Sequence, residues 1–342
     1  MRIGILTGGG DCPGLNAAIR SAFYRARKYG YETVAIYDGW KGLIEGGHTE
    51  VLKEADVKDI YNFGGTVIGS SRTNPYKIEN GEKQVLENIK KHKLDAVIAI
   101  GGEDTLGVAA KLHKAGVKIV GIPKTVDHDL SETDYTIGFD TALNVAAESI
   151  DRLHTTAKSH NRVMIVEIMG RHAGWLTLMA GIAGGAHIIL IPEKKVNIDK
   201  VCEKVLERKK RGERYTIIAV SEGIEMEGHG KEKKKLDAFG HIPLTDQGLA
   251  RTLQALIAEK TGMDVKAMVL GHLLRGGAPN AYDRITAAKI GASAVDYIKE
   301  KKFGMMTGVN GGKVTPVALE KAVAKLKTVK EEDFELLEAL ME

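Results

Sequence analysis

The feature that most constrains the fold is a repeated alternation of short apolar runs with helical patterns along the 342-residue chain. Each apolar run is rich in β-branched residues and is followed by a glycine-rich or polar loop. Strands that alternate with helices predict mostly parallel sheets wrapped by helices, so we expect an α/β fold with doubly wound domains. The predicted strands are 2–7, 33–37, 95–100, 117–122, 162–167, 188–191, 215–220 and 266–270. The clearest predicted helices are 15–29, 106–114, 142–157, 249–260 and 283–301.

Length and composition limit the functional classes. A chain of 342 residues exceeds one typical core, so two domains are expected. The formal net charge of +4 is too small to suggest a nucleic-acid partner. No apolar run approaches the roughly 20 residues needed to cross a bilayer, and Met1–Arg2 leads directly into a strand without room for a signal peptide. We therefore expect a cytoplasmic protein that binds neither nucleic acid nor membrane.

The segment 121–130 follows a predicted buried strand, the position where open α/β sheets place their ligands. Asp127 and Asp129 are two residues apart, so in an extended segment both side chains project to one side. One carboxylate could then take a proton while the other orients a ligand or binds a cation. Lys124 and Thr125 add a positive charge and a hydroxyl. The alternative is an ordinary aspartate-rich turn in which Lys124 is a solvated charge.

Two loops have the composition of phosphate-binding turns. The loop 8–14 lies between a strand and a helix, where backbone N–H groups and the helix N-terminus favour an anion. It matches neither of the two common nucleotide-binding glycine fingerprints. The loop 63–72 is rich in glycine and serine and ends at Arg72, whose guanidinium could hold a phosphate.

The loop 101–105 is acidic, with Glu103 and Asp104 at the head of a predicted helix. Carboxylates are favoured there by the helix dipole, so helix capping is one interpretation. The other is a site for a hard cation such as Mg²⁺, shared with phosphate oxygens.

Further loops after predicted strands carry Gly170 with Arg171, Glu222, and His272 with Arg275. If these loops converge on one crevice, they form a site for polyanionic ligands with acid–base chemistry. The lysine-rich stretch 226–240 has no such context and is predicted to be a solvated surface insertion.

In their order and spacing these motifs resemble the bacterial-type 6-phosphofructokinases over nearly the whole chain. The matching segments are Gly9–Arg20, Gly101–Asp104, Pro123–Asp129, Gly138–Ala142, Met169–Arg171, Glu222 and Leu270–Gly277. The resemblance implies two α/β domains with the active site in the cleft between them. It implies a donor-binding domain at 1–138 plus about 274–323, and a sugar-binding domain at 139–273 plus the C-terminal tail.

The resemblance also implies residue roles for phosphorylation of fructose 6-phosphate at its 1-hydroxyl. Asp127 is the implied base, and Asp129, Lys124 and Arg171 complete the catalytic set. Arg162 and Lys266 are expected to reach the sugar phosphate of a neighbouring subunit's site, which implies a homodimer or homotetramer with shared active sites. Glu103 is the implied Mg²⁺ ligand. The other implied sugar-binding residues are Thr125, Met169, Gly170, Glu222, His272 and Arg275, and the implied donor-binding residues are Gly9, Gly10, Arg72, Gly102, Asp104, Thr105 and Lys124.

Several positions depart from the common family pattern. Glu103 stands where Asp is usual, His128 where Asn is usual, and Lys266 where ATP-using members usually have Arg. Asp104 stands where ATP-using members usually have Gly, and Lys124 is commonly Gly there too. A carboxylate at 104 would crowd and repel the α-phosphate of ATP, whereas Lys124 could reach a shorter donor. This pair resembles the pyrophosphate-dependent branch and predicts a readily reversible reaction with inorganic pyrophosphate.

Three alternatives remain at this point. An ATP-dependent 6-phosphofructokinase would share these motifs and can also carry lysine at position 124, so Asp104 is the residue that distinguishes it. A non-catalytic sugar-phosphate sensor would keep Arg171 and His272 but would not need Asp127. A dinucleotide-dependent oxidoreductase is disfavoured because the glycine fingerprint with a ribose-binding acid is missing.

Overall fold

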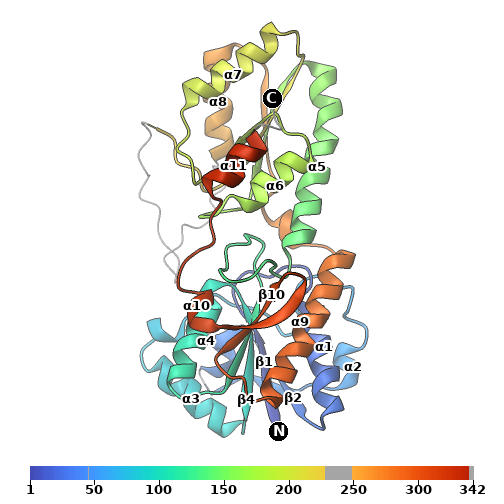
Figure 1. Cartoon of the computed structure of the whole chain (residues 1–342), viewed down its shortest axis with the longest axis vertical. Helices are drawn as coiled ribbons and strands as arrows, with labels where there is room; N and C mark the ends of the chain where they lie inside the picture. Colours follow the sequence, from blue (N-terminus) through green and yellow to red (C-terminus); the bar gives the residue numbers. More distant parts are fainter. Residues whose placement is uncertain (45, 228–248, 339–342) are drawn as a thin grey trace.

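The computed structural model describes residues 1–44, 46–227 and 249–338, which form two lobes (Figure 1). The N-terminal lobe is built on a seven-stranded sheet of order β11-β10-β5-β4-β1-β2-β3, and the other lobe on a four-stranded sheet of order β7-β8-β6-β9. All pairs are parallel except β2–β3 and β10–β11. The predicted α/β class with mostly parallel sheets is therefore confirmed.

The N-terminal lobe is built from alternating strands and helices. The chain leaves this lobe after β5 and returns to it at α9. The contact between α1 and α9 is its most extensive helix pairing. Its strands are β1 Arg2–Thr7, β2 Glu32–Ile36, β3 Thr49–Val51, β4 Ala96–Gly101, β5 Ile119–Pro123, β10 Met305–Asn310 and β11 Lys313–Ala318. Its helices are α1 Leu15–Lys28, η1 Gly39–Leu43, α2 Glu54–Val57, η2 Pro75–Lys77, α3 Gly81–Lys91, α4 Glu103–Lys114, α9 Ala281–Lys299 and α10 Leu319–Ala322.

The second lobe is assembled from the middle of the chain, and the C-terminal helix packs on it, with the Lys194 ammonium 3.6 Å from the centre of the Phe334 ring (Figure 1). Its strands are β6 Val163–Ile168, β7 Ile188–Leu190, β8 Thr216–Ser221 and β9 Val265–Val269. Its helices are α5 Phe139–His160, α6 Trp175–Ala183, α7 Ile198–Lys210, α8 Leu249–Thr261, η3 Gly271–Arg275 and α11 Glu331–Glu338. The strands of the two sheets thus come from 2–123 with 305–318, and from 163–269; the exact domain boundaries stay a prediction.

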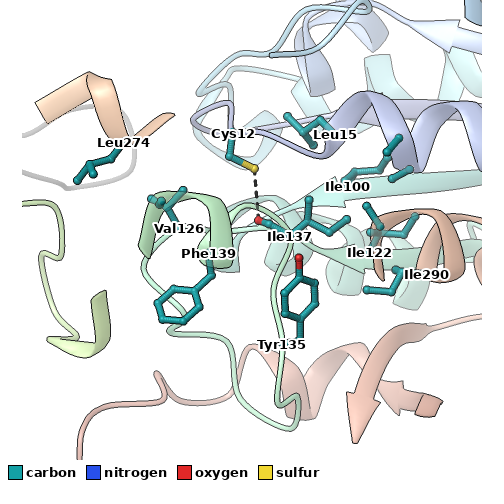
Figure 2. Packing of buried hydrophobic residues seen from close by; sticks show 14 of the residues in the cluster. Cys12, Leu15, Ile100, Ile122, Val126, Tyr135, Ile137, Phe139, Leu274 and Ile290 are labelled. Carbon is teal, nitrogen blue, oxygen red and sulfur yellow. Dashed lines mark hydrogen bonds between the residues drawn. The ribbon is translucent and has the colours of Figure 1, made fainter. Parts of the chain in front are cut away.

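A hydrophobic cluster extends across both lobes, and each lobe also has a buried cluster of its own. A single cluster of buried side chains includes Ile98 and Ile122 of the first sheet and Met164 and Val166 of the second. Figure 2 shows the junction, where the Cys12 thiol donates a hydrogen bond to the Ile137 carbonyl at 3.3 Å. Because the segment that follows the predicted catalytic residues belongs to this core, its backbone position is fixed by packing.

The structure extends or corrects several predicted elements. The strands β3, β10 and β11 and the helices α3, α6 and α7 were not predicted from the pattern. The helix predicted over 142–157 begins earlier, at Phe139, and ends later, at His160. The helix predicted from Leu106 begins at Glu103, so both acidic residues of that loop lie within its first turn.

The predicted surface insertion lies mostly outside the described residues, which omit 228–248. At its start, Met226 forms an isolated parallel bridge with Val196. Among the described ranges, no helix combines the length and the apolar character needed to span a membrane.

Candidate active site

The glycine loop after β1 is held against the N-terminus of α4. The Gly8 amide donates to the Ile100 carbonyl at 2.9 Å, and the Gly9 amide to the Ser71 carbonyl at 3.0 Å. A Cβ atom on Gly8 would stand 2.5 Å from Thr105 Oγ1, so only glycine allows this approach. The predicted donor residues Gly9 and Thr105 therefore lie together, with the 63–72 loop beside them. Arg72 directly follows Ser71 and is exposed.

Lys124 is a buried part of the site, with only 3% of its surface exposed. Its ammonium donates to the Gly10 carbonyl at 2.5 Å, and a Cβ atom on Gly9 would stand 3.5 Å from it. Burial lowers the pKa of Lys124 from its ordinary value. The interpretation of Lys124 as a solvated surface charge is therefore wrong; its charge faces the glycine loop that was predicted to hold the donor.

The turn that carries the two aspartates is bent rather than extended. His128, between them, has a left-handed backbone with φ 57°, a conformation that histidine tolerates better than most residues. The Asp127 amide donates to Thr125 Oγ1 at 3.1 Å. The expectation that both carboxylates project to one side of an extended strand is therefore wrong, because a turn replaces the strand after Pro123.

The two aspartates nevertheless remain close enough to interact. Burial first, and then the charge of Asp127, raise the pKa of Asp129 to about 7, although a Thr125 hydroxyl hydrogen bond opposes the shift. The charge of Glu103 also contributes to the increase. The carboxylates of Asp127, Asp129 and Glu103 thus share one electrostatic environment, as expected for residues predicted to act on one phosphoryl group.

On the second lobe, the loops after β6 and β8 form the opposite wall. Arg171 Nε lies 3.7 Å from Glu222 Oε1, and both side chains are largely buried. The Ser221 hydroxyl donates to the Gly170 carbonyl and ties the two loops together. Burial, followed by the charge of Asp127, raises the pKa of Glu222 to about 7. The charge of Asp127 therefore raises the pKa of a carboxyl group in each lobe, which indicates that Asp127 lies between the two walls.

The loop after β9 crosses to the first lobe. Arg275 Nη1 donates to the Asp11 carbonyl at 3.2 Å, and a Cβ atom on Gly10 would stand 2.1 Å from that nitrogen. A side chain at position 10 would displace the guanidinium from this position. His272 lies in the same short helix, η3, and is exposed. The carboxyl ends of both sheets thus face one another, and this edge gathers Met169, Gly170, Arg171, Glu222, His272 and Arg275.

Arg162 and Lys266 are not part of this group. They lie at the amino ends of β6 and β9, whereas Arg171 and His272 follow the carboxyl ends of the same strands. Both cations bind Asp264; the distance from Lys266 Nζ to Asp264 Oδ1 is 2.9 Å. A six-residue strand spans about 20 Å, so they cannot reach the site of their own chain.

The carboxylates at the head of α4 suit Mg²⁺ better than a tightly bound transition metal. In the described ranges, no group of three or more His, Cys, Asp or Glu side chains is arranged to hold a metal ion. Mg²⁺ usually takes one or two carboxylates and completes its shell with water and substrate phosphates. Burial and then the charges of Asp127 and Glu103 raise the pKa of Asp129, and a hard cation would relieve the repulsion between these carboxylates.

Two residues of the site region had no signal in the sequence. Lys327, from the segment between α10 and α11, contacts His128 through its ammonium at 3.0 Å. Asp283, at the start of α9, accepts hydrogen bonds from the Gly138 and Thr141 amides at 2.7 and 2.8 Å. Both contacts join segments more than 140 residues apart in the chain, and neither residue belongs to a recognisable motif.

Comparisons with known proteins agree with this geometry. Residues 2–298 match the family described as phosphofructokinase. A pyrophosphate–fructose 6-phosphate 1-phosphotransferase from Amycolatopsis mediterranei (strain S699) is 49% identical over 98% of this chain and 98% of its own length. An ATP-dependent 6-phosphofructokinase 3 from Streptomyces coelicolor is 44% identical over 96% of each chain. The crystal structure of a pyrophosphate-dependent phosphofructokinase from Nitrosospira multiformis superimposes with a TM-score of 0.83 at 23% identity, covering 100% of this chain and 92% of that one.

Proposed function

Because this chain belongs to the phosphofructokinase family, we propose that it transfers a phosphoryl group from inorganic pyrophosphate to the 1-hydroxyl of fructose 6-phosphate, reversibly. The observation that carries the donor assignment is the presence of two charged residues, the buried Lys124 and Asp104 in the first turn of α4. The pyrophosphate-dependent relative is also more similar to the chain than the ATP-dependent one, at 49% against 44% identity.

Asp104 disfavours ATP by charge. It lies in the first turn of α4, directly after the Gly101–Gly102 turn that ends β4. In the family's ATP-using members this position faces the α-phosphate of the nucleotide. Two like charges about 4 Å apart at an effective dielectric near 20 repel by about 4 kcal/mol, enough to reduce ATP use by orders of magnitude. Pyrophosphate has no α-phosphate or ribose to place there.

In the proposed reaction the sugar 1-hydroxyl attacks the nearer phosphorus of pyrophosphate. A P–O bond forms to the sugar oxygen, the bridging P–O–P bond breaks, and the hydroxyl proton passes to Asp127. Lys124, held against the Gly10 carbonyl at 2.5 Å, stabilises the charge on the departing phosphate. Arg171, positioned near Glu222, stabilises the transferred group and helps to hold the sugar. Such a transfer needs mainly positioning and charge neutralisation, which these residues supply.

The proposal includes Mg²⁺, with Glu103 as its protein ligand. When bound, the ion neutralises charge on the phosphate oxygens and draws the donor to the head of α4. The longer side chain of glutamate keeps the charge that aspartate would supply there.

The proposal also includes a homodimer or homotetramer with shared sites. Its support is the exposed face of β9 and η3, where Met268, Val269 and Leu273 are 41%, 50% and 69% exposed, on the elements that carry Lys266 and His272. Such apolar exposure is typical of a surface that another chain covers. Arg162 and Lys266 would then serve the neighbour's sugar phosphate.

The proposed compartment is the cytoplasm, because Cys12 and Cys202 are both buried and free.

A direct assay tests the proposal. Purified protein is supplied with fructose 6-phosphate and Mg²⁺, and either pyrophosphate or ATP, and the bisphosphate product is measured. We expect strong activity with pyrophosphate and weak or no activity with ATP, and formation of pyrophosphate when the bisphosphate and inorganic phosphate are supplied instead. Asp127→Ser protein is the control for contaminating activity. Efficient use of ATP without pyrophosphate activity would instead favour the ATP-dependent alternative, for which the 44% identical relative is the supporting observation.

A further inference from the structure

A segment near the C-terminus, residues 325–329, lies between α10 in the first lobe and α11 in the second (Figure 1). We call it the strap. Its backbone is bound on both sides: the Lys327 amide donates to the Asp129 carbonyl at 2.7 Å, and the Lys327 carbonyl accepts from Trp175 Nε1 at 2.9 Å. The strap therefore links the turn that holds the predicted base to α6 of the sugar-binding lobe.

The Lys327 side chain points into the protein. Its ammonium lies 3.0 Å from His128 Nε2 and donates to the Thr133 carbonyl at 3.1 Å. It also lies 5.5 Å from the centre of the Trp175 ring. Burial lowers the pKa of Lys327, whereas the charges of Asp134 and Asp333 oppose this shift. A lysine held by two acceptors and an aromatic ring has little freedom to move.

The hydrogen bonds define the tautomer of His128. The Thr136 hydroxyl donates to the Thr125 carbonyl at 2.9 Å, so towards His128 Nδ1, 3.3 Å away, it acts as an acceptor. Nδ1 therefore carries the proton, and Nε2 is free to accept from the Lys327 ammonium. Burial and the nearby ammonium lower the pKa of His128 to about 3, so the ring stays neutral at physiological pH. The ring also stacks on Phe139, with centroids 4.3 Å apart.

This chain of hydrogen bonds ends at the Thr125 carbonyl, in the turn that carries both aspartates. Thr125, whose carbonyl is held by Thr136, accepts the Asp127 amide at 3.1 Å and donates its hydroxyl to the Asp129 carboxylate. A series of hydrogen bonds thus leads from the strap ammonium, through a neutral imidazole and the Thr136 hydroxyl, to the backbone of Thr125, whose side chain in turn accepts the Asp127 amide. His128 has the strained left-handed backbone at the centre of this turn, a conformation that persists only when its surroundings hold it.

We propose that Lys327 is a positioning residue for phosphoryl transfer, which acts through His128 to fix the turn that carries Asp127 and Asp129. This inference rests on the proposed roles of the two aspartates. A purely structural strap would need only its backbone contacts, its bond to Trp175 and its apolar neighbours. The partly buried ammonium adds the bonds to His128 and Thr133 and its position over the Trp175 ring, and of these only the contact with His128 reaches the turn between the two aspartates.

The test compares Lys327→Met with Lys325→Met, an exposed lysine two residues earlier on the same strap. Displacement of a reacting group by about 1 Å can cost on the order of 100-fold in rate, so we expect Lys327→Met to lower kcat by roughly 10- to 100-fold. The KM values for both substrates should change by less than about threefold, since the binding loops are untouched. Lys325→Met should retain the kcat of the unmodified protein. An unchanged kcat in Lys327→Met, or an equal loss in both variants, would overturn the proposal.

A double-mutant cycle asks whether the effect passes through His128. If it does, Lys327→Met added to His128→Asn should cause little further loss of kcat, because the link is already broken. Losses in kcat that multiply independently would show that Lys327 acts by another route and would overturn the proposal. Near-ultraviolet circular dichroism and Tm are measured on every variant to identify loss of fold.

A spectroscopic measurement on the unmodified protein needs neither activity nor a folded Lys327 variant. In ¹⁵N–¹H correlation spectra, the ring signal that disappears in His128→Asn should show a protonated Nδ1 and a bare Nε2. A ring protonated at Nε2, or at both nitrogens, would overturn the proposed chain of hydrogen bonds. Because this readout is independent of turnover, a failure of the proposed function, seen as unchanged kcat in Asp127→Ser, remains distinguishable from a failure of this inference.

Discussion

In the four-stranded sheet, oppositely charged residues lie both at the carboxyl ends of the strands, which we call the carboxyl edge, and at the amino ends, the amino edge. The two groups have different environments. At the carboxyl edge, the side chains of Arg171 and Glu222 are 19% and 10% exposed, and burial raises the pKa of Glu222. At the amino edge, Asp264 is 44% exposed, and hydrogen bonds from Lys266 and Arg162 lower its pKa. Burial is thus the main cause of the pKa shift at the carboxyl edge, and hydrogen bonding to cations is the main cause at the amino edge. The first edge thus faces the predicted site of its own chain, whereas the second is an exposed basic surface, to which the proposed oligomer assigns a role in a neighbouring chain's site.

The largest expected effect concerns the group that the carboxyl edge faces. Asp127→Ser should lower kcat by at least the roughly 10²- to 10⁴-fold typical of a general base, while the KM for fructose 6-phosphate changes much less. The physical reason is that the proton transfer is made only in the transition state. Steady-state kinetics in both directions would measure this, and retention of most of the kcat would remove Asp127 from the mechanism.

The second prediction places one mutation at each edge, in two different chains that are then mixed. If the amino edge serves a neighbour's site, Asp127→Ser and Arg162→Ala chains should complement one another when they are co-assembled. Random pairing of the two chains in shared-site dimers leaves about a quarter of the sites intact, so activity should recover to that order. Mixing either variant with itself is the control. A fully active monomer in analytical ultracentrifugation would show that Arg162 has no such role.

The third prediction uses the opposite pKa shifts of the two edges. Burial raises the pKa of Glu222 from 4.5 to about 7. Between these two pH values, Glu222 is therefore protonated in the folded protein but ionised in the unfolded chain. The free energy of unfolding therefore falls as pH rises through this window. Glu222→Gln lacks this loss and should gain stability relative to the unmodified protein up to about pH 7, on the order of 1–3 kcal/mol. Urea unfolding at several pH values would measure it, and a difference that does not vary with pH would contradict the shift.

The smallest effect is expected at the amino edge, with Asp264→Asn. The pKa of Asp264 is lowered, so the stability that its charge provides is present above the unfolded pKa and is lost only as pH falls through the folded pKa. Solvent-exposed ion pairs add little stability, so the variant should show almost the same Tm as the unmodified protein at any pH from 5 to 8. A large loss of Tm in this range would mean that the open edge contributes to the fold.

Parts of the fold and site that depend on local patterns could be predicted from the sequence. Apolar β-branched runs that alternate with helices define parallel strands, and glycine loops at their carboxyl ends mark the phosphate-binding side. The hairpin β10–β11 could also have been found, since Asn310 and Gly311 to Gly312 form a turn signal between two strands.

Other parts could not be predicted, because they depend on contacts between distant segments. The buried state of Lys124 results from its approach to Gly10, 114 residues earlier. The turn at His128 contacts Lys327, 199 residues later. A single sequence contains no periodicity or motif that pairs such positions. The sequence therefore predicted candidate residues for the site, whose roles stay predictions, but not the conformation of the turn at its centre.

The most direct test of pyrophosphate as the donor is the ratio of kcat/KM for pyrophosphate to that for ATP, measured in the unmodified protein and in Asp104→Gly. The unmodified protein should favour pyrophosphate by orders of magnitude, since Asp104 repels the α-phosphate of ATP. Removal of this carboxylate should lower the ratio by at least about tenfold, mainly through a gain in ATP use, and Lys124→Gly added to it should lower the ratio further. A ratio that favours ATP in the unmodified protein, or one that Asp104→Gly leaves unchanged, would contradict the assignment of the donor.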